Sequence, residues 1–315
     1  MTEPREIHPG VTYQVTHTTI GRMFLLKPDD VVNQVMLFCL FRAANKFGVL
    51  VHSVMVESNH FHAVITDVRG NLSGFMHWFD MMTAKNLIAH YEKLHPDVYL
   101  AEIWSKGKFN AVILPNASSV IDAISYDLVN PVKDGLVLDY RNWPGLKSRP
   151  GDWLQPARVV TRPTGLAFND KNKQDRKVKA QYVVPPAFRD RPKQLVVDDV
   201  HAKIRDVTQS ARKERSLENK AFMGVKAVLA ASPFDSPNKP RAKGKRAPTF
   251  AAGGDTELLK EGLKRVRAFR QSYHDCIKRL LGGALDVVFP AGTYLMRVRF
   301  KVPCDDWSPP WACAV

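Results

Sequence analysis

The sequence predicts an α+β fold, with a ferredoxin-like antiparallel sheet that carries helices on one face and a basic α+β C-terminal extension. Three observations support this prediction. The first 140 residues follow the order strand, helix, strand, strand, helix, strand, helix, which suits an antiparallel sheet with packed helices. Two β-rich runs, 49–56 and 60–68, flank a short turn and resemble a hairpin. Hydrophobic residues make up 45% of the 315 residues, enough for a packed core.

The other elements of the first 140 residues follow from residue types and boundaries. Residues 11–20 combine β-branched and aromatic side chains, as strands do. Residues 28–48 open with Pro28 and two acids and end at Gly48, which are the boundaries of a helix. The remaining expected elements are a helix at 71–96, a strand at 109–114, and a helix at 116–131 that begins with Asn and Ser and is halted by Pro131.

The second half of the chain has a different composition. Residues 141–165 are rich in Pro, Gly and Trp and predict an irregular connection, and the Pro-rich basic segment 232–250 predicts a mobile loop. Helices are expected at 196–222 and, with a clear amphipathic pattern, at 255–283. Residues 293–302 alternate strictly along the chain, which predicts a strand.

The net charge of +15 lies entirely in the second half. Residues 1–150 contain 14 basic and 14 acidic residues, whereas residues 151–315 contain 32 basic and 17 acidic residues. Such an excess usually serves a polyanion, most often nucleic acid, and solubility alone is the simpler alternative. We therefore divide the chain into an N-terminal domain, 1–140, and a basic C-terminal region, 141–315, that is expected to bind DNA.

Two groups of basic side chains are candidates for DNA contact. Alternation places three of them on one face of the expected strand, where they could follow a DNA backbone. The expected loop carries five more. The simpler interpretation of both groups is solvated surface charge. The candidates are Arg297, Arg299 and Lys301 on the strand, and Lys239, Arg241, Lys243, Lys245 and Arg246 in the loop.

The remaining composition predicts an intracellular protein. No run of about 18 apolar residues predicts a membrane span, and the N-terminal residues "MTEPREIHPG" lack the layout of a signal peptide. The four cysteines are scattered and form no C-x-x-C pair. This pattern favours a reduced protein over a disulfide framework or a structural zinc site.

The stretch "VESNHFHAVITD" (56–67) carries the first candidate for chemistry. His60 and His62 stand two residues apart on the expected strand, so both side chains project from the same face. Two imidazoles on one strand face can chelate a divalent metal, although a lone H-x-H more often marks exposed or hydrogen-bonded histidines.

The segment "ISYDLVNP" carries the second candidate. Tyr126 and Asn130 stand four residues apart on the expected helix and share a face. On spacing alone, Tyr126 is a tyrosine at the edge of the core, and Asn130 is the polar residue ahead of a helix-ending proline.

Together, "VESNHFHAVITD" and "YDLVNPVKDGLV" resemble the HUH single-tyrosine transposases, most of all the REP-associated tyrosine transposases. That family pairs a strand of the type N-H-x-H-L-L with a helix of the type Y-I-x-x-N-P-V-x-A-G-L-V. The order and separation of the two motifs match, and the resemblance covers residues 10–140. Asp134 stands where the family usually has a small residue, and the second half is longer than in compact members.

The resemblance implies a transposase that cleaves and rejoins single-stranded DNA through a 5′-phosphotyrosine. Tyr126 would be the nucleophile, and His60, His62 and Asn130 would hold Mg²⁺ or Mn²⁺. The partner would be single-stranded DNA with hairpins or palindromic repeats, and the location would be the nucleoid of a bacterial cytoplasm. Family members occur as monomers and as homodimers, and the sequence leaves this choice open.

Three alternatives remain at this level. A host-adopted relative would use the same chemistry to process chromosomal repeats. A catalytically silent DNA-binding regulator would keep the fold and the charge without cleavage. A replication initiator or plasmid relaxase fits less well, because the further motifs or fused helicase parts of those proteins are not found in this sequence.

Overall fold

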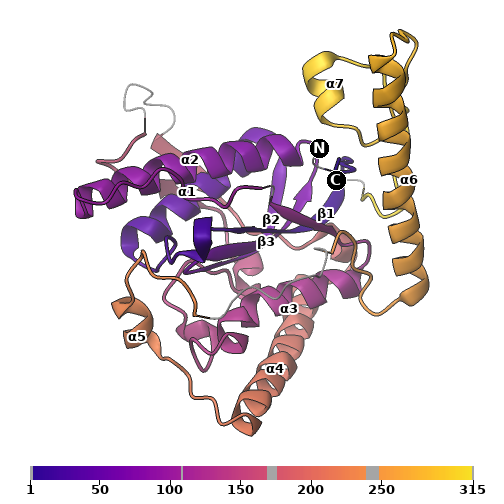
Figure 1. Cartoon of the computed structure of the whole chain (residues 1–315). Helices are drawn as coiled ribbons and strands as arrows, with labels where there is room; N and C mark the ends of the chain where they lie inside the picture. The colour runs from indigo at the N-terminus through magenta and orange to yellow at the C-terminus, as the bar shows by residue number, and fades with distance from the viewer. Residues whose placement is uncertain (1–2, 108, 169–175, 239–247, 314–315) are drawn as a thin grey trace.

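A four-stranded antiparallel sheet forms the centre of the computed structural model, which describes residues 3–107, 109–168, 176–238 and 248–313 (Figure 1). Its strands are β1 (Val11–Thr18), β2 (Val49–Glu57), β3 (His60–Asp67) and β4 (Asn110–Ile113), in the order β2-β3-β1-β4. β1 pairs antiparallel with both β3 and β4, and β2 pairs antiparallel with β3. This order is that of a ferredoxin-like sheet, so the predicted α+β class is confirmed.

Helices lie on both sides of this sheet. Helices α1 (Asp30–Phe47) and α2 (Leu72–Leu94) pack together on one face (Figure 1), but α3, which was also expected on that face, does not lie there. Helix α3 (Ala117–Lys133) contacts β2 and β3 from the opposite face, and α4 (Lys193–Leu217) packs against α3. The sheet is therefore covered by α1 and α2 on one side and by α3, backed by α4, on the other.

Side-chain caps fix where the helices begin. The Asp29 carboxylate accepts a hydrogen bond from the backbone N–H of Val32 at the start of α1, and α1 ends at Gly48, whose φ is +70°. At the start of α2, the Asp67 carboxylate accepts from the N–H groups of Asn71 and Leu72. Asp67 thus serves as a helix cap at the end of β3 and has no role at the histidines.

The predicted stop at Pro131 is wrong. Helix α3 continues through Pro131 to Lys133 and ends at Asp134. Proline lacks its own N–H, and its ring crowds the carbonyl four residues earlier, but only two residues of α3 follow Pro131, so little of the helix depends on passing it. The Asp134 N–H still donates to the Asn130 carbonyl, and the N–H of Leu136 donates to the Pro131 carbonyl. Asn130 is therefore a fully helical residue and not a loop residue.

The main core crosses the boundary drawn at residue 140. Val51 forms a backbone bridge with Tyr182, and Met55 forms one with Lys147. Buried side chains from residues 143–252 join the same hydrophobic core as the sheet. The further elements are the paired strands β5 (Arg158–Thr161) and β6 (Lys177–Ala180), the short 3-10 helices η1 (Ile20–Arg22), η2 (Tyr140–Asn142), η3 (Pro150–Leu154) and η5 (Pro186–Phe188), and helices α5 (Val225–Ala230), α6 (Thr256–Leu281) and α7 (Leu295–Phe300).

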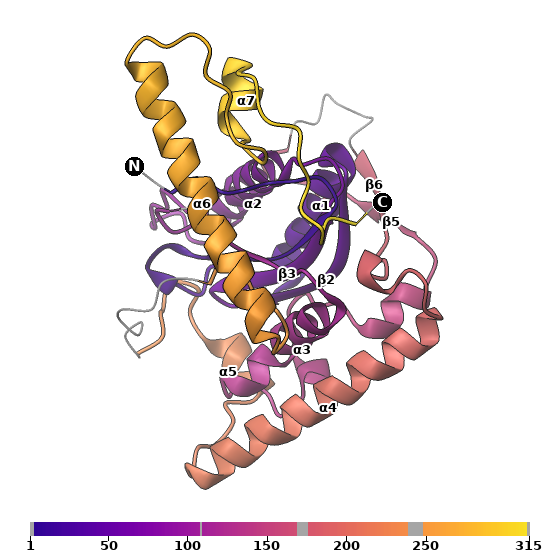
Figure 2. The ribbon, with the colours of Figure 1, turned by 90° about the vertical axis from the view of Figure 1, so that its right-hand side faces the viewer.

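A second, smaller core holds the C-terminal end of α6 against α7. Its buried members are Cys276, Val287, Phe289 and Met296. We call this part, residues 273–304, the C-terminal lobe. It stands at the outer end of α6, away from α3 (Figures 1 and 2). The predicted amphipathic helix at 255–283 is confirmed by α6, and its apolar stripe packs first on the main core and then on the lobe.

The predicted strand at 293–302 is wrong, because Leu295–Phe300 form helix α7. A strand needs a partner for its backbone groups, and within the described residues none pairs with this segment. Leu, Met and Arg also have high helix propensities. Arg297 and Arg299 stand two residues apart, which places them on different faces of a helix. The single basic face expected for these side chains therefore does not exist.

The other predicted basic group, Lys239 to Arg246 in the loop 232–250, lies outside the described residues. Its described flanks contact the main fold: the N–H of Phe24 donates to the Asp235 carbonyl, and the N–H of Ile113 donates to the Thr249 carbonyl. In the parts of the chain that the structure describes, no helix is both long and apolar enough to span a membrane.

Candidate active site

The hairpin of β2 and β3 places both histidines on the face that α3 covers. His60 pairs across the ladder with Glu57 and Thr18, and His62 pairs with Met55 and Thr16. Phe61 projects from the opposite face, where its ring contacts Phe79 and Trp104. This alternation is the one expected from the sequence, and the packing of Phe61 fixes the strand under the two imidazoles.

Hydrogen bonds at Nδ1 fix the orientation of both imidazoles. The Nδ1 atom of His60 lies 2.7 Å from the Asn59 Oδ1 atom, which only accepts, so Nδ1 carries the proton. The Nδ1 atom of His62 lies 2.8 Å from the Thr16 hydroxyl and 3.3 Å from the Asp127 carboxylate. Protonated Nδ1 atoms leave the Nε2 lone pairs of both rings free, as metal binding requires.

Burial keeps both rings neutral. It lowers the pKa of His60 to about 4, and the nearby Arg22 adds to this effect. Burial and the neighbouring His60 also hold the pKa of His62 well below its usual range. At neutral pH, two uncharged imidazoles therefore face α3.

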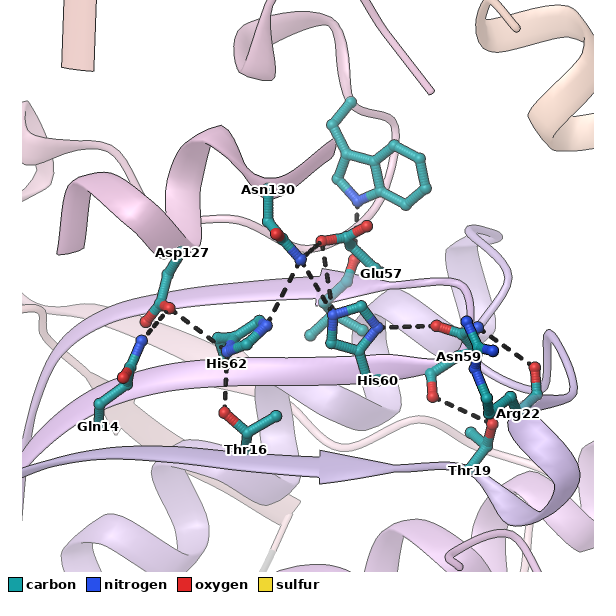
Figure 3. Close-up of polar contacts among 12 residues, drawn as sticks. Gln14, Thr16, Thr19, Arg22, Glu57, Asn59, His60, His62, Asp127 and Asn130 are labelled. Atoms are coloured by element: carbon teal, nitrogen blue, oxygen red, sulfur yellow. Dashed lines mark hydrogen bonds and ion pairs between the residues drawn. The ribbon is translucent and has the colours of Figure 1, made fainter. Parts of the chain in front are cut away.

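Asn130 reaches the histidines from α3, as Figure 3 shows. Its Nδ2 atom lies 3.1 Å from His60 Nε2 and 3.5 Å from His62 Nε2. The same Nδ2 atom donates to Glu57 Oε1 at 2.6 Å. Residues 70 positions apart in the sequence thus meet at one point, which confirms that the two motifs lie together in the fold.

Two buried carboxylates complete this network. Glu57 is the last residue of β2 and is 1% exposed, and its pKa is raised well above its usual value by burial and by the nearby Asp134. Asp127, on α3, is fully buried and accepts a hydrogen bond from Gln14 (Figure 3). Burial raises the pKa of Asp127 well above its usual value. The sequence pattern alone did not assign Asp127, although its position four residues before Pro131 on the same helix as Tyr126 offers a signal.

Tyr126 stands at the rim of this network. Its ring centroid lies 6.1 Å from that of His62, and the side chain is 46% exposed. The ammonium of Lys133 lies 3.9 Å from the centroid of the Tyr126 ring. Partial burial raises the pKa of the Tyr126 phenol, and the negative charges of Asp127, Asp134 and Glu57 raise it further. The phenol is therefore protonated at neutral pH and accessible to a substrate.

The donor set fits a hard divalent cation. Within the described residues, no group of three or more His, Cys, Asp or Glu side chains is placed to hold a metal ion. An amide could add a third ligand, and the Asn130 amide lies at the histidines, with its Nδ2 atom 3.1 and 3.5 Å from the two Nε2 atoms. An amide binds a cation through its oxygen, so Asn130 would serve through Oδ1 and not through the nitrogen from which these distances are measured.

Two open clefts meet at the site. One, of about 1160 Å³, runs between the β1–β4 edge, the first half of α3 and α6, and both His62 and Tyr126 line it. The other, of about 1290 Å³, runs between the β2–β3 turn and α4, and His60, Glu57 and Lys133 line it. The histidines therefore lie between two clefts, and an extended polymer could occupy both clefts at once.

A further histidine of the sheet and the predicted basic side chains lie elsewhere. His17 projects from the α2 face of the sheet, where it stacks on Trp104 and lies 3.1 Å from the Asp80 carboxylate, so it does not approach His60 and His62. Arg297, Arg299 and Lys301 are exposed on the C-terminal lobe and are not brought to the histidines. Their contact with DNA stays a prediction.

Comparison with known proteins adds two distant structural similarities. No family model matches the chain, and no curated protein matches its sequence. A REP-associated tyrosine transposase bound to a REP hairpin is similar at 20% identity and a TM-score of 0.40, over 54% of this chain and 99% of that one. A tRNA(His) guanylyltransferase from Saccharomyces cerevisiae is similar at 16% identity and a TM-score of 0.29, over 46% of this chain and 72% of that one. Because both similarities are distant, a function for this chain has to be inferred from the side chains of the site.

Proposed function

We propose that this protein is a metal-dependent transposase that cleaves and rejoins single-stranded DNA through a 5′-phosphotyrosine. One observation carries the proposal: the fold brings Tyr126 and Asn130 onto the face of the sheet from which His60 and His62 project. An accessible hydroxyl nucleophile beside two neutral imidazoles and an amide is a set of groups suited to phosphodiester transfer.

In this proposal the Tyr126 hydroxyl attacks the scissile phosphorus. The bond from tyrosine oxygen to phosphorus forms, and the bond from phosphorus to the 3′-oxygen breaks. The phenolic proton is lost as the tyrosine oxygen attacks, and the leaving 3′-oxygen takes up one proton, so the charges balance. Attack of a 3′-hydroxyl on the phosphotyrosine reverses these steps and rejoins a strand, and no nucleotide cofactor is consumed.

His60, His62 and Asn130 would hold Mg²⁺ or Mn²⁺ beside the scissile phosphate. When bound, the cation supplies charge for the phosphate oxygens in the transition state. Hydrogen bonds at their Nδ1 atoms hold His60 and His62 in place, and α3 holds Asn130 and Tyr126 one turn apart. Because the two imidazoles are fixed by these hydrogen bonds and Tyr126 is fixed on α3, they need little reorganisation when the substrate arrives.

The two clefts support a single strand as substrate. A strand crossing the histidines would place one side of its scissile bond in each cleft, next to Tyr126 in the first and Lys133 in the second. A base-paired strand cannot easily be fed across the sheet to the histidines, because its partner strand would have to enter the same clefts. We propose hairpins or palindromic repeats in single-stranded DNA as the substrate, with basic side chains contacting phosphates for position.

A covalent adduct on Tyr126 tests the proposal. The full chain is incubated with 5′- and 3′-labelled single-stranded hairpin libraries in Mn²⁺ or Mg²⁺, and adducts are separated by denaturing electrophoresis. We expect an adduct that keeps the label 3′ of the cut, with the modified residue identified by mass spectrometry as Tyr126. Tyr126→Phe should form none while binding the same DNA.

Tyr273→Phe is the matched control, because Tyr273 is a partly buried tyrosine on α6 away from the histidines. It should form the adduct at the wild-type level. An adduct that persists in Tyr126→Phe would show that the nucleophile is another residue.

A catalytically silent DNA-binding regulator is the second candidate. One observation favours it: partial burial, with a further contribution from the acids around Tyr126, raises the pKa of its phenol and so opposes formation of the nucleophilic phenolate. A regulator would bind DNA hairpins with or without a divalent cation and would form no adduct at any pH or cation concentration.

A further inference from the structure

Three hydrogen-bond acceptors converge on one atom of Asn130. The Glu57 carboxylate and the two unprotonated Nε2 atoms of His60 and His62 lie 2.6, 3.1 and 3.5 Å from Asn130 Nδ2 (Figure 3). An amide NH₂ has only two hydrogens and cannot satisfy three acceptors. The point that Nδ2 occupies is therefore one where a positive charge would be stabilised by a carboxylate and two imidazoles.

The amide orientation follows from the same three acceptors. The Asn130 Nδ2 atom donates to Glu57 Oε1, and the unprotonated Nε2 atoms of both imidazoles can only accept, so the amide presents its nitrogen and not its oxygen to all three groups. Asn130 can bind a cation only through Oδ1. If the amide turns by about 180°, Oδ1 takes the place of Nδ2, 2.6 Å from the Glu57 oxygen. Two oxygen acceptors at that distance repel each other unless a cation lies between them.

We propose that Glu57 is a further ligand of the divalent cation, and that it changes from the hydrogen-bond partner of Asn130 to a ligand when the Asn130 amide turns. The inference rests on the metal site of the proposed function and adds a residue to it. The ligands would then be two imidazole nitrogens and two side-chain oxygens. Such a mixed set suits Mn²⁺ and Mg²⁺ better than a set without a carboxylate.

The position of Glu57 in the fold supports this role. Glu57 pairs with His60 across the two-residue turn of the hairpin, and its Oε1 atom already lies 3.7 Å from His60 Nε2. The side chain is 1% exposed and faces α3, yet it lines the cleft on the α4 side. In the described residues no three acids and imidazoles are grouped for a metal, and the Asn130 Nδ2 atom lies 2.6 Å from the Glu57 oxygen that would have to move. The Asn130–Glu57 hydrogen bond and the bound cation are therefore alternatives.

Mn²⁺ binding to the full chain without DNA tests the proposal. Titration calorimetry with MnCl₂, with the free ion followed by electron paramagnetic resonance, is compared for the wild type and Glu57→Gln. Glutamine keeps the length of the side chain and an oxygen that accepts from Asn130 Nδ2, but it removes the charge. We expect the dissociation constant for Mn²⁺ to rise at least about tenfold in Glu57→Gln, since lost ligands or their supports typically cost 10- to 100-fold in affinity.

Asp134→Asn is the matched control, because Asp134 is an exposed acid close enough to raise the pKa of Glu57. Asp134→Asn removes one negative charge from the same cleft without removing a proposed metal ligand. It should therefore change the Mn²⁺ affinity less than about threefold. Glu57→Gln also removes a buried charge, so it should melt at or above the wild-type temperature without Mn²⁺. The melting temperature of the wild type should rise with Mn²⁺, and that rise should be reduced in Glu57→Gln.

If Glu57→Gln binds Mn²⁺ with the wild-type affinity, the proposal is wrong, and Glu57 serves only as the hydrogen-bond partner of Asn130. Loss of binding in His60→Ala with His62→Ala would assign the measured ion to this site. If the wild type binds no Mn²⁺, this proposal and the metal site fail together. If Mn²⁺ binds through Glu57 but no tyrosine adduct forms, this proposal stands and the transposase chemistry fails.

Discussion

The histidine site and the C-terminal lobe use polar residues in opposite ways. At the site, polar side chains from different elements hold one another by hydrogen bonds: Asn130 of α3 is held by Glu57 of β2, and Asp127 of α3 by Gln14 of β1. In the lobe, a small apolar core is enclosed and the basic side chains Arg297, Arg299 and Lys301 are exposed.

This difference separates two physical tasks. Bond breaking requires groups held to within fractions of an ångström, which buried networks provide. Attraction of a polyanion requires only charge near a surface, which exposed arginines and lysines provide through counterion release. Substitutions at the histidine site should therefore abolish DNA cleavage and leave the affinity for DNA unchanged. Substitutions in the lobe should weaken DNA binding and leave the cleavage rate unchanged.

The largest expected effect comes from removing both imidazoles. His60→Ala with His62→Ala should reduce the rate of single-strand cleavage at least about a thousandfold, because the stabilisation of charge on the scissile phosphate is lost. DNA affinity, measured by fluorescence anisotropy, should change by less than about threefold, since most affinity comes from phosphate contacts elsewhere. Single-turnover cleavage measures the first quantity.

His274→Ala serves as its control, because His274 is a partly exposed histidine on α6. It should cleave at the wild-type rate. A double alanine variant that still cleaves would remove the metal from the proposed mechanism and erase the distinction between the two regions.

A smaller and opposite effect is expected from the lobe. Arg297→Gln with Arg299→Gln should weaken DNA binding on the order of tenfold and lower the slope of log affinity against log salt by about two. Cleavage at saturating DNA should be unchanged. Lys85→Gln with Lys93→Gln, two exposed lysines on α2, is the matched control. An unchanged salt slope in the arginine variant would assign the charge of the lobe to solubility.

The smallest effect concerns stability against pH in the sheet. His52 is 1% exposed, and both its ring nitrogens are hydrogen-bonded, to the Val183 carbonyl and the Thr66 hydroxyl. Burial lowers the pKa of His52 to about 4. The unfolded chain, with a histidine pKa near 6.5, therefore binds more protons below pH 6.5, and the folded state loses stability as the pH falls toward 4.

From pH 8 to pH 5, this one group should lower the free energy of unfolding by about 2 kcal/mol. His52→Asn retains a donor for the Val183 carbonyl and cannot titrate. Urea unfolding of both proteins at pH 5 and pH 8 should show that the variant lacks this part of the pH dependence. Equal pH dependence in the two proteins would contradict a neutral, buried His52.

The sequence predicted the parts of the structure that local patterns determine. The strand alternation around Phe61 predicted the face of His60 and His62, and the four-residue step predicted that Tyr126 and Asn130 share a face of α3. Both follow from the fixed geometry of strands and helices, and both are confirmed. The metal ligands and the nucleophile themselves stay predictions.

Contacts between distant elements escaped the sequence analysis. The partners of Glu57 and Asp127 depend on how α3 crosses the sheet, which no local pattern encodes. The alternation at 293–302 failed for a related reason, because a strand forms only beside another strand and none of the described strands pairs with it. Pro131 failed as a stop because its effect depends on how near it stands to the end of the helix.

The position of β1 in the middle of the sheet has a consequence during synthesis of the chain on the ribosome. β1 pairs with β3 and also with β4, and Tyr126 follows β4 on α3. During synthesis, both histidines are therefore present about 60 residues before Tyr126 is added, which corresponds to an interval of several seconds. Under the proposed function, the nucleophile is therefore the last part of the site to be synthesised, after all four strands of the sheet.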